Sequence, residues 1–113
     1  MIRMQALRRY ALSLPEAEER ETWGEATFRV RDRIFLMASP GGKGASVKAS
    51  LEAQEALVRS EPATFSVASY VGRYGWIAVD LGRVDPDEMR ELVAEAWRMT
   101  APKRLVVEFD APG

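Results

Sequence analysis

Residues 27–39 read TFRVRDRIFLMAS, and this stretch decides the fold. Phe28 and Val30 alternate with polar neighbours, which predicts a strand with one buried face. The largely apolar run from Ile34 to Ser39 predicts a second strand, buried on both faces. Because Asp32 lies between the two runs and suits a tight turn, the stretch predicts a β-hairpin.

Downstream of the hairpin, the sequence predicts two more strands and a helix between them. The glycine-rich residues 40–44 predict a flexible loop that leads into a third strand at residues 45–49. Ser50 is a suitable N-cap for a helix that ends near Ser60. The apolar face of this helix is expected to contain Leu51, Ala53, Ala56 and Leu57. Residues 76–81 alternate as a strand, and residues 63–73 have room for a short one.

A further helix is predicted near the C-terminal end, and its start signal is the clearest in the chain. Asp85 is the expected N-cap, Pro86 takes the first helical position, and Glu88 completes a capping-box variant. Its apolar stripe reaches Trp97, and Pro102 breaks the pattern. The residues from 103 onward fit either a short helix or a strand.

The chain before the hairpin begins with a predicted helix and continues with an acidic segment. The helix face is formed by residues at helical spacing, namely Leu7, Tyr10, Ala11 and Leu14. Pro15 ends this helix, because proline disfavours helical geometry in the residue before it. The glutamate-rich segment from Glu16 to Glu25 is interpreted as solvated surface between helix and strand.

These elements predict one α+β domain, an antiparallel sheet with helices packed on it. The length of 113 residues suits a single domain, since domains cluster near about 100–150 residues. We expect the core to occupy residues 1–105 and residues 106–113 to form a C-terminal tail.

Composition restricts the chemistry that the chain can support. It has no cysteine and no histidine, so thiolate catalysis, zinc–thiolate sites and imidazole acid–base catalysis are excluded. No cofactor, no metal site and no catalytic residue are predicted, and a binding protein is expected rather than an enzyme. No apolar run approaches the length of about 20 residues that a membrane span needs, so a cytoplasmic protein is expected.

Basic side chains gather at the predicted turns and define one candidate surface. These are Arg29, Arg31, Arg33, Lys43 and Arg73. Hairpin tips that carry arginine and lysine can contact nucleic-acid phosphates, although charged hairpins also keep sheets soluble. The net charge of −1 gives no general basic excess for such a role.

A second candidate surface is a groove lined by aromatic side chains and one lysine. Its expected members are Trp23, Lys48, Tyr70 and Trp76. Trp76 points away from the face that holds Ile77 and Val79, where it either packs under a second layer or lines the groove. Lys48 would pair with an anion, so this alternative predicts a small anionic ligand or a peptide.

Several short motifs resemble the MmcQ/YjbR family, in order along nearly the whole chain. They are Thr22-Trp23-Gly24, Thr27-Phe28-Arg29-Val30, Val47-Lys48, Tyr70-Val71-Gly72-Arg73-Tyr74-Gly75-Trp76, Ala96-Trp97-Arg98 and Ala101-Pro102-Lys103-Arg104-Leu105. The turn Arg31-Asp32-Arg33 departs from the glycine–lysine turn that relatives often have.

The resemblance implies a CyaY/frataxin-like α+β fold with a double wing, and a DNA-binding function inferred for these bacterial proteins from their shape. The wings would be the hairpin at residues 31–33 and the segment at residues 73–76. By analogy with frataxin, metal binding at the acidic segment is a weaker alternative, because a shared fold does not imply a shared function.

Overall fold

The hairpin predicted at residues 27–39 is confirmed in the computed structural model, which describes residues 1–112. Its strands are β2 (Glu25–Val30) and β3 (Arg33–Ala38), joined by a turn. The register shifts between Phe28 and Arg29, which leaves Phe35 as an extra residue in β3. This bulge lets both Phe35 and its neighbour Leu36 reach the core, where both are fully buried.

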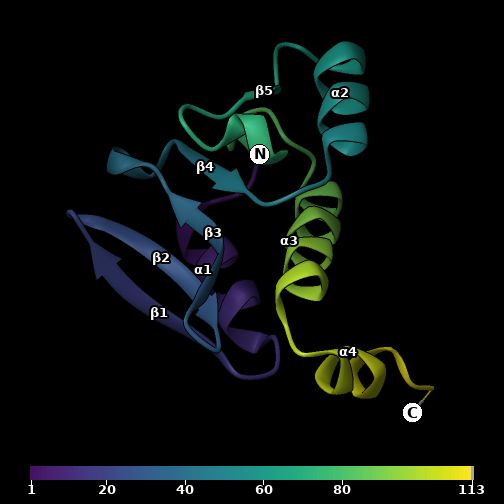
Figure 1. Ribbon diagram of the computed structural model, residues 1–113. Helices are drawn as coiled ribbons and strands as arrows, with labels where there is room; N and C mark the ends of the chain where they lie inside the picture. The colour runs from purple at the N-terminus through teal and green to yellow at the C-terminus, as the bar shows by residue number, and fades with distance from the viewer. Residues whose placement is uncertain (113) are drawn as a thin grey trace.

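The remaining elements of the described chain combine with this hairpin into a single antiparallel sheet with helices (Figure 1). The other strands are β1 (Ala17–Thr22), β4 (Gly44–Val47), β5 (Phe65–Val67) and β6 (Ile77–Asp80). The helices are α1 (Met4–Ser13), α2 (Leu51–Ser60), α3 (Pro86–Thr100) and α4 (Lys103–Asp110), with short 3-10 turns η1 (Pro40–Gly42) and η2 (Gly72–Tyr74).

The sheet has six strands in the order β1-β2-β3-β4-β6-β5. The first four strands are neighbours in sequence as well as in space, whereas β6 lies between β4 and β5. All pairings are antiparallel. The α+β class with helices on an antiparallel sheet is therefore confirmed.

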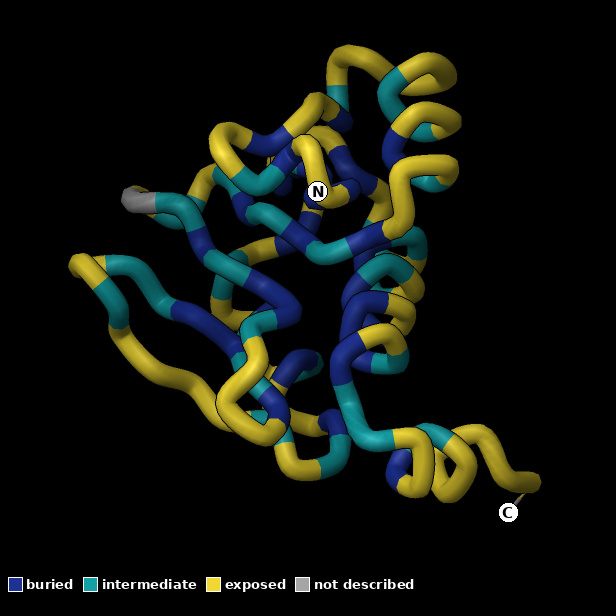
Figure 2. The backbone as a smooth tube through the Cα atoms, viewed as in Figure 1, coloured by how far each residue is buried: buried dark blue, intermediate teal, exposed yellow. Residues whose placement is uncertain are grey.

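The core lies between the sheet and helices α1 and α3. One row across the inner face is fully buried and consists of Phe28, Leu36, Val47 and Ile77, on β2, β3, β4 and β6. Figure 2 shows buried positions along these strands and along the side of α3 that faces them. Trp97 of α3 is fully buried in the same core, and its indole Nε1 donates to the carbonyl of Pro15 at 3.0 Å.

The opposite face of the sheet carries small and polar side chains. The neighbouring row contains Thr27, Met37, Ser46, Ala78 and Ser66, one residue each from β2, β3, β4, β6 and β5. Met37 and Ile34 are only partly buried. The prediction that β3 is buried on both faces is therefore wrong, because α1 and α3 pack against one face of the sheet only.

The capping signals predicted two helix starts correctly. The Ser50 side chain accepts the N–H of Ala53 at 3.1 Å, and the Asp85 side chain accepts the N–H of Glu88 at 3.0 Å. Each bond satisfies a first-turn donor that the helix itself leaves without an acceptor.

The predicted inner face of α2 is right in part, because Ala53 and Leu57 pack against the core. Leu51 is 58% exposed and Ala56 is also exposed, whereas Gln54 is buried. The Gln54 Nε2 donates to the carbonyls of Gly72 and Trp76 at 2.7 and 2.8 Å. A polar side chain therefore attaches α2 to the η2 segment.

Two other expectations need correction. The acidic segment is not a loop: residues 17–22 form β1, an edge strand whose glutamates are mostly exposed. Residues 103–110 form α4, so the expected boundary at residue 105 falls inside a helix. Leu105 of α4 is buried, and the ring of Phe109 packs on Trp97 with centroids 5.0 Å apart.

Candidate binding surfaces

The β2–β3 turn is held in a conformation that favours asparagine and glycine. Arg31 and Asp32 have positive φ angles of 52° and 66°, as in a type I′ turn. The Arg31 guanidinium donates to both carboxylate oxygens of Glu16, at 2.5 and 3.2 Å. Arg20 forms an ion pair with Asp32 at 2.5 Å. Two ion pairs therefore support a backbone that bulky residues adopt at some cost.

Helix α4 brings further positive charge to this turn. The hydrogen bond from Arg31 lowers the pKa of Glu16, and the charge of Arg104 also lowers it. The carbonyl of the preceding Pro15 accepts from Trp97, on which Phe109 of α4 packs, so α4 lies on the same side of the molecule as Glu16. The pairing with Glu16 raises the pKa of Arg31. We call the exposed side chains of Arg31, Arg33, Lys103 and Arg104 the basic turn surface.

Helix α4 also presents backbone donors at this surface. It begins after Pro102 without a side-chain cap. The N–H groups of Lys103 and Arg104 therefore have no acceptor within the helix. Within residues 1–112, Arg33, Lys103 and Arg104 form no ion pair with a carboxylate. These groups are available to an anion.

The structure separates the five basic residues predicted to contact nucleic acid. Arg31 and Arg33 lie together at the β2–β3 turn, while Arg29 is partly buried within β2 and donates to the hydroxyls of Thr22 and Thr27. Lys43 lies beyond the opposite end of β3. Arg73 lies in η2, on the far side of β4 from the turn, with its guanidinium 4.8 Å from the ring centroid of Tyr74.

The four residues of the predicted groove are not brought together either. Lys48 follows β4 and lies beside Trp76 in the β4–β6 register, but Trp76 is only 8% exposed. Tyr70 is 96% exposed, in the loop between β5 and η2. Trp23 lies in the β1–β2 turn, at the other end of the sheet from Lys48. These positions do not form one continuous groove.

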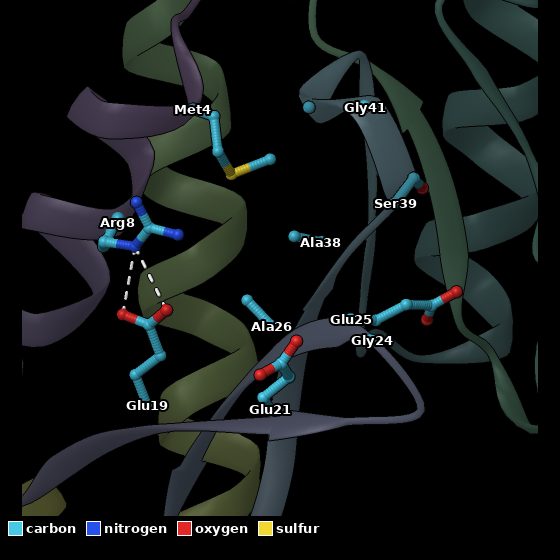
Figure 3. A pocket seen from close by; sticks show the side chains of 11 residues that line it. Met4, Arg8, Glu19, Glu21, Gly24, Glu25, Ala26, Ala38, Ser39 and Gly41 are labelled. Carbon is cyan, nitrogen blue, oxygen red and sulfur yellow. Dashed lines mark hydrogen bonds and ion pairs between the residues drawn. The ribbon is translucent and has the colours of Figure 1, made fainter.

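A cleft of about 380 Å³ lies where the sequence predicted no site, between α1 and the β1–β2 hairpin (Figure 3). Met4 and Arg8 come from α1, and Glu19 and Glu21 come from β1. The Arg8 Nε donates to both oxygens of Glu19, at 3.0 and 3.2 Å. Ala26 provides an apolar surface between these side chains.

No motif pointed to this cleft, because its walls come from α1, the β1–β2 hairpin and the β3–β4 connection, which meet only in the folded chain. One signal was present in the sequence. Glu19 and Glu21 are two residues apart, so they share a face if their segment is a strand. A loop has no such alternation, so the predicted loop did not place Glu19 and Glu21 on one face.

The described residues contain neither a cluster of metal-ligating side chains nor a helix that could span a membrane. Within residues 1–112, histidine, cysteine, aspartate and glutamate do not gather in a group of three or more that could hold a metal ion. No helix in the same part of the chain has both the length and the apolar character needed to cross a bilayer.

A protein-family model described as YjbR matches residues 12–99 of the chain. The chain belongs to the YjbR family. Uncharacterized proteins from Mycobacterium bovis and Mycobacterium tuberculosis are 34% identical over 90 residues, which is 75% of this chain and 70% of theirs.

A crystal structure of a Deinococcus radiodurans protein with a DUF419 domain shares the YjbR fold. It aligns with a TM-score of 0.80 at 20% identity, over 88% of this chain and 78% of the other. Helix α4 lies outside the YjbR match, which ends at residue 99. Lys103 and Arg104 of the basic turn surface therefore lie outside the part of the chain that matches the family model.

Proposed function

We propose that this protein binds DNA through its backbone phosphates, using the basic turn surface. The observation that carries the proposal is that the β2–β3 turn and the start of α4 both expose arginine or lysine side chains and that both act on Glu16, through the hydrogen bond of Arg31 and the charge of Arg104. Arginine matches phosphate oxygens well, and its guanidinium can donate two parallel hydrogen bonds. The uncapped first turn of α4 adds backbone donors of the kind that bind phosphate.

We further propose that the protein acts by binding and not by catalysis. The support is the chemistry of the sequence, which contains neither histidine nor cysteine. The proposed contacts carry no information about base sequence, because phosphate contacts fix position and register only. We therefore expect weak binding with little sequence preference, at dissociation constants of about 10⁻⁴ to 10⁻⁶ M.

Glu16 gives the proposal a specific test, because it occupies the guanidinium that a phosphate would need. Glu16→Gln removes a negative charge beside Arg31 and should tighten DNA binding. Arg31→Ala and Arg33→Ala should each weaken it, and each should reduce the slope of log K against log salt concentration by about 1. Fluorescence anisotropy of a short labelled duplex, between about 50 and 200 mM salt, measures both effects.

Lys43→Ala is the matched control, because Lys43 is exposed but lies at the opposite end of β3. It should leave the affinity and the salt slope almost unchanged. The proposal fails if Lys43→Ala weakens binding as much as Arg33→Ala does. It fails equally if the protein does not bind the duplex at the lowest salt concentration.

A further inference from the structure

Strand β1 forms a free edge of the sheet. Within the described residues it pairs only with β2, and it is the first strand in the sheet order. The N–H of Ala17 donates to the carbonyl of Leu14 at 3.1 Å instead of to β2. Since backbone direction alternates along an antiparallel strand, Glu19 and Glu21 also point their N–H and C=O groups away from β2. This edge can accept another strand.

The charge of the edge selects what could pair with it. Glu18, Glu19, Glu21 and Glu25 surround this hairpin, against Arg8, Arg20 and the partly buried Arg29, and within residues 1–112 Glu21 and Glu25 form no ion pair. Phosphates would be repelled here. A second copy of β1 would set glutamates opposite glutamates, which is destabilising in a sheet. A strand rich in lysine or arginine is complementary.

Trp23 adds an anchor at the end of the same strand. Its side chain is 97% exposed, and its φ angle of 54° lies in a region that a bulky residue rarely adopts. Neither property stabilises the isolated fold. Exposed tryptophan is among the side chains that contribute most to protein–protein interfaces, and backbone strain of this kind concentrates at functional positions.

The cleft between α1 and the hairpin can take the side chains of an added strand. Glu19 and Glu21 point into it from β1, and Met4 and Ala26 line it (Figure 3). The methylene groups of a lysine could pack on the apolar side chains while its ammonium group pairs with Glu21. The cleft therefore fits a long basic side chain better than a short or acidic one.

We propose that the free edge of β1 binds an extended, lysine- or arginine-rich segment of another protein, which adds to the sheet as a further strand and packs on Trp23. Strand addition of this kind derives affinity from backbone hydrogen bonds and specificity from pockets for alternate side chains. Charged edge strands also protect sheets from aggregation. That role accounts for the glutamates but not for the exposed tryptophan in a strained turn.

The first test uses three blocked peptides of equal length: alternating Lys–Val, alternating Glu–Val, and Lys–Val with N-methyl groups on alternate residues. Because Trp76 and Trp97 are buried, a change in tryptophan emission reports mainly on Trp23. The Lys–Val peptide should shift the emission to shorter wavelength. The Glu–Val and N-methylated peptides should bind about tenfold more weakly or worse, since one lacks the charge and the other the backbone donors.

Variants test the residues directly, with anisotropy of a labelled Lys–Val peptide as the measurement. Trp23→Asn and Glu21→Gln should each weaken binding by about tenfold or more. Trp23→Asn creates an Asn-Gly turn with Gly24, a favoured type I′ sequence, so its melting temperature should be maintained. Loss of binding in this variant is then not a loss of folding. Glu52→Gln on α2 is the control and should bind as the parent does.

Three results would overturn the proposal: equal affinity for the Lys–Val and Glu–Val peptides, unchanged affinity after N-methylation, or unchanged affinity in Trp23→Asn. The outcome is independent of DNA binding. Arg31→Ala and Arg33→Ala should leave peptide binding intact, because the β2–β3 turn lies at the opposite end of β2 from Trp23.

Discussion

Gln54 shows how much one side chain can contribute to the shape of this protein. Its amide nitrogen donates to two carbonyls of the η2 segment, at 2.7 and 2.8 Å, while the residue is only 8% exposed. Gly75 in the same segment approaches the backbone so closely that a Cβ would lie 2.2 Å from the carbonyl oxygen of Ala49. The segment is thus fixed by a polar bond and by close backbone packing.

Removing the Gln54 amide should destabilise the protein measurably. Gln54→Ala leaves the carbonyls of Gly72 and Trp76 without this donor, and we expect a loss of about 1–3 kcal/mol in the free energy of unfolding. Urea denaturation measures the loss. Glu55→Ala, on the exposed side of the same helix, should change stability by less than about 0.5 kcal/mol. Equal losses in the two variants would show that the amide bonds contribute little.

Sequence patterns could not have identified Gln54, because they classify glutamine as polar and place it on the outer face. The same limitation applies to Trp23 and Trp76. Both are tryptophans in the motifs that resemble the family, yet one is almost fully exposed and the other is buried. Residue type sets a preference for burial, and only the packing of neighbouring elements decides it.

At the scale of elements, three carboxylates meet where α2 ends and α3 begins. Burial raises the pKa of Glu88, and the negative charges of Glu61 and Asp85 raise it further. A carboxyl group whose pKa is raised on folding stabilises the protein when it is protonated. That stabilisation is present below the unfolded pKa of about 4.3 and is lost as the pH rises through the folded pKa.

Glu88→Gln should therefore stabilise the protein at pH 7 and have little effect at pH 3. The gain should stay below about 1 kcal/mol, because solvent screens groups that are this exposed. Thermal melts across the pH range compare the variant with its parent. Glu108→Gln, on the exposed side of α4, should show no comparable trend with pH. A gain that persists at pH 3 would exclude repulsion among the three carboxylates as its cause.

Elements with strong local signals were predicted well, and the others were not. The hairpin and the starts of α2 and α3 follow from alternation and from capping side chains at known spacing. Strand β1 has a single apolar residue, Ala17, because one edge and much of its surface face solvent, so it resembles a loop in sequence. The sequence of α4 fits either a helix or a strand, because its contacts with Trp97 and Arg98 form only in the folded chain.

At the scale of the whole molecule, the sequence identified the family and the α+β class correctly but did not assemble either of the surfaces proposed above. Two of the five predicted basic residues, Arg31 and Arg33, belong to the proposed DNA surface, and Lys103 and Arg104 were missed. The reason is topological. Strand order decides which turns share an end of the sheet, and the order of β5 and β6 cannot be read from alternation or composition.

The position of β6 between β4 and β5 also has a consequence for the order of folding. Strands β1 to β4 pair with sequence neighbours, so each pairing closes a short loop at low entropic cost. Within the described residues, strand β5 pairs only with β6, and β6 pairs with β4 across all of α2. We expect the four-stranded meander to form first and the α2–β5 unit to join late, when β6 docks.

Two buried phenylalanines make this order measurable. Phe28 of β2 and Phe65 of β5 both lie in the core, so replacing either with leucine is a similar perturbation. In stopped-flow refolding, Phe28→Leu should mainly slow folding, whereas Phe65→Leu should mainly accelerate unfolding. The reverse pattern would contradict the expected order. If that order holds, the newly made chain can complete four of the six strands of its sheet before residues 51–80 have folded.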